Sequence, residues 1–167
     1  MTGVVCAIAS GAGVFTVDRL GSELESSLRA GQIVRAHMQG DMMHDAIRAD
    51  VIGAMEATII GSGFDLKEIA ADFAEHSREF KESIETAASL ATDAETAEAL
   101  KGVEAPLIAY EESARKIIEM AASDPGAARA AYPDFMRQFK ALKGAMEAAA
   151  DKIEAEAAAQ ADAALAF

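Results

Sequence analysis

The feature that most constrains this chain is a long segment near its N-terminus that contains no helix breaker. No proline occurs between residues 18 and 60, and apolar residues recur there at intervals of three and four. This spacing places them on one face of an α-helix. The segment therefore predicts one long amphipathic helix. Its apolar residues are Leu20, Leu24, Leu28, Val34, Val51, Ile52, Met55 and Ile59.

The second half of this predicted helix carries ionisable side chains in the direction of its apolar face. Projected at about 100° per residue, that face centres on Ile33, Val34, Val51, Ile52 and Met55. Four ionisable residues project the same way: His37, Asp41, His44 and Arg48. Burying such groups without partners costs free energy, so they must pair with one another, remain hydrated or bind a ligand.

Composition favours a single all-helical domain and excludes several classes of function. The 167 residues suffice for one domain; tryptophan is absent and there are only three prolines. The formal net charge of -13 excludes a nucleic-acid-binding surface, because no basic stripe is available to neutralise phosphates. A lone cysteine, Cys6, rules out an internal disulfide and a cysteine-based zinc site. No catalytic motif occurs, so we do not expect an enzyme.

Glycine- and proline-containing turns divide the chain into four predicted helices. Glycines end the first helix near residues 61–64, a Thr-x-x-Glu capping box at 92–95 begins the third, and a Ser-Asp-Pro-Gly turn at 123–126 begins the fourth. The predicted helices span about residues 18–60, 65–91, 95–122 and 125–164.

Short connections make consecutive helices antiparallel neighbours. The predicted fold is an all-α, up-down-up-down antiparallel four-helix bundle with long first and fourth helices and both chain ends at one pole. Pro106 predicts a kink in the third helix, or a break with residues 101–105 as a separate turn, and Pro133 predicts a bend in the fourth.

The N-terminal segment is apolar and uncharged. Residues 3–17 contain no charge and lead without a break into the amphipathic helix. The run is shorter than the roughly twenty residues of a membrane span, and no basic residues precede it as in a secretory signal. We interpret residues 1–17 as the C-terminal end of a transmembrane helix, the alternative being an apolar helix start buried in the domain of residues 18–167. Residues 163–167 are also apolar, so both ends are predicted to enter a membrane on the same side.

The segment Asp41 to Ala57, DMMHDAIRADVIGAMEA, carries a resemblance to a known family. It resembles the first-helix motif, such as MHDALRADVLAAL, of the four-helix-bundle ligand-binding domains of bacterial methyl-accepting chemotaxis receptors. The order of apolar segment, long helix, two shorter helices and long helix is similar to that family as well. Outside these seventeen or so residues the chain matches only in pattern.

The resemblance implies a sensor domain that faces the periplasm as part of an inner-membrane receptor. Such a domain binds a small molecule and signals across the membrane to cytoplasmic domains, and it has no enzymatic activity of its own. A non-sensory amphipathic helical interaction protein remains the alternative from a different class.

The ionisable residues of the first helix are the candidate ligand site. Arg48 is the best anchor for a small organic anion, because a guanidinium binds a carboxylate through two hydrogen bonds. His44 lies one turn away, and Asp41 and Asp45 lie within reach of both. The structural alternative is a network in which these groups only pair with each other.

Further candidates come from the middle of the chain and from the first helix. His76 projects near the apolar face of the second helix, and Tyr110 faces inward from the third and could form a polar wall of the site. His37 and His44 lie two turns apart, about 10 Å, which is too far for one metal ion to bind both. We expect no cofactor; the alternative is a haem or a divalent metal held by His37, His44 or His76.

The first helix also carries a row of residues suited to a partner helix. The row keeps three-four spacing and places small residues where a second helix would approach closely. It predicts a parallel homodimer packed through the first helix with help from the fourth. The residues are Leu20, Leu24, Ser27, Gly31, Val34 and Met38.

Overall fold

The computed structural model describes the backbone of residues 3–165 and the side chains of residues 19–163. Within that range all regular structure is helical and no strand occurs, so the predicted all-α class is confirmed. The helices are α1 (Gly3–Glu56), α2 (Leu66–Leu90), α3 (Ala94–Lys101), α4 (Glu104–Ala121) and α5 (Pro125–Leu165).

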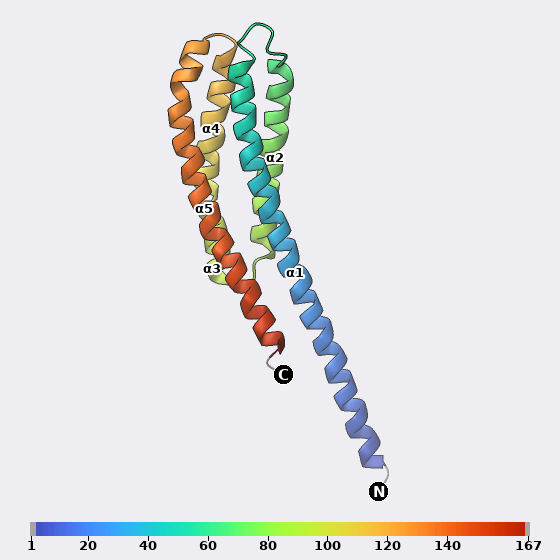
Figure 1. The fold of residues 1–167 in the computed structure, drawn as a ribbon. Coiled ribbons are helices and arrows are strands. Elements are labelled where there is room, and N and C mark those ends of the chain that lie inside the picture. The colour runs from blue at the N-terminus through green and yellow to red at the C-terminus, as the bar shows by residue number, and fades with distance from the viewer. Residues whose placement is uncertain (1–2, 166–167) are drawn as a thin grey trace.

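Figure 1 shows how these helices are arranged in space. The helices α1, α2, α4 and α5 lie alongside one another, and α3 lies below α4 as part of the same arm. The chain reverses direction between α1 and α2 and again between α4 and α5, and its two ends lie towards the same pole. The N-terminal part of α1 extends beyond the other helices. The loop between α1 and α2 and the turn between α4 and α5 form the opposite pole, which we call the distal pole.

The predicted third helix is two helices. The first, α3, ends at Lys101, and Gly102 follows as its C-cap, so the chain breaks rather than kinks. Pro106 then lies in the first turn of α4, where its missing N–H removes no hydrogen bond of the helix. Pro133 lies inside the continuous helix α5.

The predicted capping box at residues 92–95 is wrong in its details. Asp93 is the N-cap of α3, and its carboxylate accepts hydrogen bonds from the backbone N–H groups of Glu95 and Thr96. The Thr92 hydroxyl instead donates to Glu156 on α5, at 2.6 Å. Thr92 therefore ties the turn to a neighbouring helix instead of capping its own.

The distal end of α1 is shorter than predicted. The helix ends at Glu56 and not near residue 60, and the chain turns through Gly61 and Gly63, whose φ angles are 81° and 79°. This left-handed region favours glycine. The predicted turn at residues 61–64 is therefore part of a longer loop that begins at residue 57.

The inward face of α1 differs from the predicted one. Ile33 and Val51 are buried as expected, but their neighbours Val34 and Ile52 are 37% and 40% exposed. The buried face is instead continued by a glycine that allows close packing, because Gly40 lies against Phe80 and Ile84 of α2. The other buried residues of this face are Ala36, Met43, His44, Ile47, Asp50 and Ala54.

Candidate functional site

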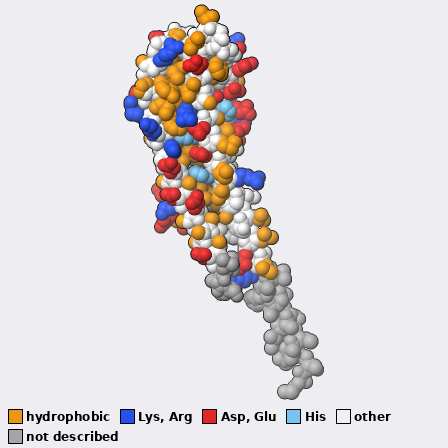
Figure 2. Space-filling model, viewed as in Figure 1, with side chains coloured by type: hydrophobic (Ala, Val, Ile, Leu, Met, Phe, Trp, Pro, Cys, Tyr) orange, Lys and Arg blue, Asp and Glu red, His pale blue; other side chains and the backbone are white. Residues whose placement is uncertain are grey.

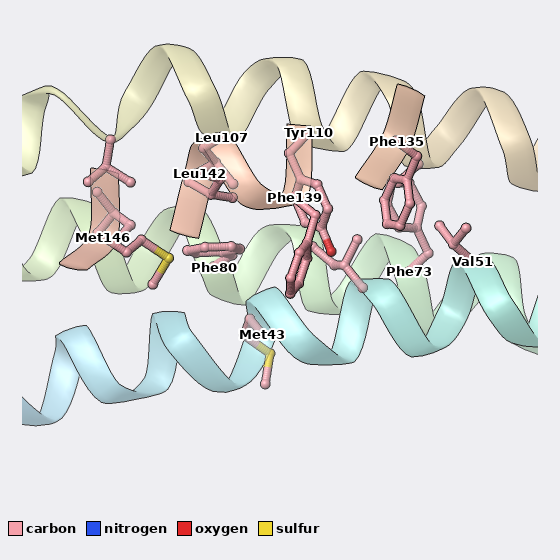
Figure 3. Close-up of a cluster of buried hydrophobic side chains, with 14 of the residues drawn as sticks. Met43, Val51, Phe73, Phe80, Leu107, Tyr110, Phe135, Phe139, Leu142 and Met146 are labelled. Atoms are coloured by element: carbon pink, nitrogen blue, oxygen red, sulfur yellow. The ribbon is translucent and has the colours of Figure 1, made fainter. Parts of the chain in front are cut away.

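His44 lies at the centre of the core, among aromatic side chains from three helices. Its ring stacks on Phe139 of α5 with 4.1 Å between ring centroids and 12° between ring planes. Tyr110 of α4 meets it edge-on at 5.1 Å, and Phe80 of α2 lies at 6.3 Å. Figure 3 shows Phe80, Tyr110, Phe135 and Phe139 within this layer of the core. The sequence prediction that His44 and Tyr110 face inward is therefore confirmed by their positions.

The polar atoms of this cluster are engaged with backbone groups of the protein itself. The Tyr110 hydroxyl donates to the backbone carbonyl of His44 at 2.7 Å, and His44 Nε2 lies 3.2 Å from the Phe139 carbonyl oxygen, to which it donates in the neutral tautomer that carries its proton on Nε2. Burial lowers the pKa of His44 and raises that of Tyr110, so both rings are held neutral. His44, Tyr110 and Phe139 are at most 7% exposed, so a ligand would reach the space between them only by opening the core.

Arg48 lies at the edge of this cluster rather than inside it. Its side chain is 39% exposed, with the guanidinium carbon 4.7 Å from the centroid of the Phe139 ring and one nitrogen 3.3 Å from Asp45 Oδ1. Asp41 and Asp45 are exposed. The prediction that Asp41 and Arg48 lie on the buried stripe is therefore wrong. Of the four ionisable residues assigned to that stripe, His44 alone is fully buried, and His37 is half-buried.

His37 and His76 do not join His44. His37 lies two turns before it on α1, and its Nδ1 is buried with no hydrogen-bond partner in the part of the chain that the structure describes. Burial lowers the pKa of His37, against an opposing effect of nearby Asp41. His76 of α2 contacts a different residue, Asp50 of α1, with 2.7 Å between Nδ1 and Oδ2.

Two buried carboxylates were missed by the sequence prediction. Asp50 is 8% exposed, and burial raises its pKa, although the hydrogen bond with His76 opposes the rise. Glu111 of α4 is 3% exposed; its Oε2 lies 2.7 Å from Lys81 Nζ, and its Oε1 has no hydrogen-bond partner among the described residues. Burial also raises the pKa of Glu111. Their spacing could have indicated this burial. Asp50 lies three residues after the buried Ile47 and Glu111 lies four after the buried Leu107, so each shares a helix face with a core residue.

No group of three histidine, cysteine, aspartate or glutamate side chains that could hold a metal ion occurs among residues 19–163. The three histidines lie at separate places in the bundle, with His44 in the aromatic core, His76 against Asp50 and His37 towards the N-terminal part of α1. Among the predicted site residues, the charged group that an anionic ligand could reach is the partly exposed guanidinium of Arg48.

Among the grooves on the surface of the described part of the chain are three that lie between helices. One of about 710 Å³ lies between α1 and α2, one of about 790 Å³ lies between α1 and α5 at the end that carries the termini, and one of about 470 Å³ lies between α2 and the α3–α4 arm. None of these three is lined by His44, Arg48 or Tyr110.

Comparisons of the chain with known protein families, curated proteins and solved structures find no match. The resemblance to chemoreceptor sensor domains therefore depends on residues 41–57 and on the order of the helices. None of the helices, over residues 19–163, is long and apolar enough to cross a membrane. The predicted membrane segment at residues 3–17 and the apolar residues 164–167 lie outside the side chains that the structure describes.

Proposed function

We propose that this chain is the ligand-sensing domain of a bacterial transmembrane chemoreceptor, and that it faces the periplasm from the inner membrane. In this proposal the helices form an up-down-up-down antiparallel bundle with long first and last helices. Both chain ends then meet the membrane, where the flanking apolar segments anchor the domain. A small organic anion binds to the domain, and the signal passes along the helices to the cytoplasm.

The observation that carries the proposal is a row of exposed apolar side chains along α1, which we call the α1 stripe. It consists of Leu20, Leu24, Leu28, Val34, Met38 and Met42, of which all except Val34 are at least 60% exposed. In Figure 2, orange side chains line the outer edge of the narrow lower part of the molecule, next to the grey atoms. Soluble monomers rarely expose such a continuous apolar row, whereas a partner helix would bury it.

A second copy of the chain is the partner that suits this stripe. Gly31 lies within the row, and a side chain added there would meet nothing within 4 Å, so the surface is open to a close approach. Anchoring both copies at the same pole would align their α1 helices in parallel. The proposed homodimer therefore packs α1 against α1, with support from α5.

Arg48 remains the proposed anchor for the anion. By helical projection it lies on the flank of α1 between the α5 contact and the α1 stripe. Its present partner, Asp45, is 64% exposed, and a surface pair of this kind contributes only about 0–1 kcal/mol. A ligand carboxylate can therefore replace Asp45 at little cost. The Phe139 ring beneath the guanidinium would hold it in place.

Calorimetry with a panel of organic acids and amino acids tests the anchor. Losing a charge-assisted contact costs on the order of 2 kcal/mol or more, so Arg48→Ala should weaken binding at least tenfold and leave the helix content unchanged. Arg137→Ala is the matched control, because Arg137 is an exposed arginine that also pairs with an aspartate three residues away. If Arg48→Ala binds as tightly as the unmodified chain, Arg48 is not the anchor.

Sedimentation equilibrium tests the dimer. We expect a concentration-dependent dimer that is weakened by the double substitution Leu24→Glu and Met38→Glu. Ile108→Glu, at an exposed apolar residue of α4, should leave association unchanged. A chain that stays monomeric at millimolar concentration would contradict the proposed assembly.

A further inference from the structure

The groove between α2 and the α3–α4 arm combines an apolar floor with charged walls. Its floor contains Ile84, Leu100 and Leu107, which are at most 7% exposed, and the apolar side chain of Ile108 lies at its rim with 47% exposed. The groove exists because α2 packs closely against α1 but only loosely against α4. Its volume of about 470 Å³ lies within the range of small-molecule sites.

The walls of this groove carry two carboxylates that form no ion pair among the described side chains. Glu85 lines it from α2 and Glu104 from α4. Neither forms an ion pair within 4.0 Å with any of the described side chains. Lys81 and Lys101 also line the groove. The Lys81 ammonium is paired with Glu111, whereas Lys101 forms no ion pair with a described side chain. Two carboxylates and one ammonium group are thus available to a ligand.

Glu85 is available because its natural partner is engaged elsewhere. Lys81 lies four residues before Glu85 on α2, the spacing at which lysine and glutamate normally pair. The Lys81 ammonium instead lies 2.7 Å from the buried Glu111 carboxylate, where the surrounding dielectric makes the attraction stronger. Glu111 therefore acts as a positioning residue that draws Lys81 away from Glu85.

We infer that this groove binds a small organic cation, a primary amine carried on an apolar body. Glu85 and Glu104 approach the ammonium group from opposite walls, while Ile84, Leu107 and Ile108 contact the apolar body. The net charge of -13 adds to the attraction that these carboxylates exert on a cation at this groove. An anionic ligand would find Lys101 opposed by both carboxylates. This site is separate from Arg48 and does not depend on the proposed anion site.

Three probes with the same apolar body separate charge from hydrophobic contact: 2-phenylethylamine, 2-phenylethanol and 3-phenylpropanoate. Titration of the whole chain, with the isoleucine methyl groups observed by NMR, should shift the Ile84 and Ile108 signals. We expect the amine to bind roughly five- to tenfold more tightly than the alcohol, because each partly exposed ion pair adds up to about a factor of five. The propanoate should bind more weakly than the alcohol.

Matched double variants test the carboxylates. Glu85→Gln with Glu104→Gln should reduce amine affinity to that of the alcohol. Glu75→Gln with Glu119→Gln removes the same charge from exposed residues of the same two helices outside the groove, and it should reduce affinity less than twofold. Equal binding of all three probes, tighter binding of the propanoate, or equal losses in the two double variants would each overturn the inference.

Discussion

The two ends of the molecule are built on the same helix α1 but stabilised in different ways. In the distal part, α1 packs against three other helices around Phe80, Tyr110 and Phe135, which are fully buried. In the part near the termini, which we call the stalk (residues 19–32 of α1 and 157–163 of α5), α1 faces three alanines and Gln160 of α5 across a groove of about 790 Å³. The Ser26 hydroxyl donates to Gln160 Oε1 there at 2.9 Å. The outward leucines of the stalk, Leu20, Leu24 and Leu28, are 60% exposed or more.

This difference shows that α1 is apolar on two faces, of which one is buried within the chain and the other is exposed. The inward face of α1 in the distal part closes the core of its own chain. The outward face, the α1 stripe, contributes almost nothing to that core, because its side chains remain in water. The distal part is therefore expected to set the free energy of unfolding of the single chain, whereas the stalk is expected to contribute little to it without the proposed partner.

The largest expected effect is the loss of a core aromatic side chain. Phe135→Ala removes a side chain that is 0% exposed and that stacks with Tyr110 at 5.1 Å between centroids. We expect the free energy of unfolding to fall by about 3–5 kcal/mol. Chemical denaturation at low protein concentration, where the single chain predominates, measures it.

Leu24→Ala in the stalk is the control that sharpens the comparison. Leu24 is 63% exposed, so the same measurement should change by less than about 0.5 kcal/mol. If Leu24→Ala destabilised the dilute chain as much as Phe135→Ala, the stalk would be an integral part of the core and the contrast between the two regions would be wrong.

The helices could be predicted from the sequence because periodicity and breakers are local signals. The positions of α2 and α5 agree closely with prediction, since glycine, proline and a capping aspartate mark their ends. The face of α1 could not be predicted as well. Val34 and Ile52 belong to its outward side, and Ile33 and Val51 to its inward side. When the residues of both faces are treated as one apolar face, its calculated centre falls between the two true faces. Asp41 and Arg48 lie in that intermediate direction.

The interior partners could not be predicted because they depend on which helices meet. The contact between Asp50 and His76 joins α1 to α2, and the ion pair of Glu111 with Lys81 joins α4 to α2. No local pattern relates residues so far apart in sequence. His44 and Tyr110 were predicted to face inward from spacing alone, but the hydrogen bond between them requires the register of α1 against α4.

A smaller expected effect is a dependence of the free energy of unfolding on pH. It arises from two histidines, one in the distal part and one near its border with the stalk. Burial lowers the pKa of His44 and His37 below the 6.5 of an unfolded histidine. Between 6.5 and the lowered value, the unfolded chain binds more protons than the folded chain. The contribution of these two histidines to the free energy of unfolding should therefore be complete above pH 6.5 and decrease as the pH falls below it.

Denaturation between pH 7.5 and 5.5 measures this slope, and His44→Gln should reduce it. In the double variant His37→Gln and His44→Gln, the slope should vanish or reverse. The raised pKa values of Asp50 and Glu111 act in the opposite direction, because folded carboxyl groups with a raised pKa bind protons before unfolded ones do. A slope that is the same in the unmodified chain and in both variants would mean that the two histidines titrate as they do in water. In that case the region around His44 would be open to solvent, and the contrast between a closed distal core and an open stalk would fail.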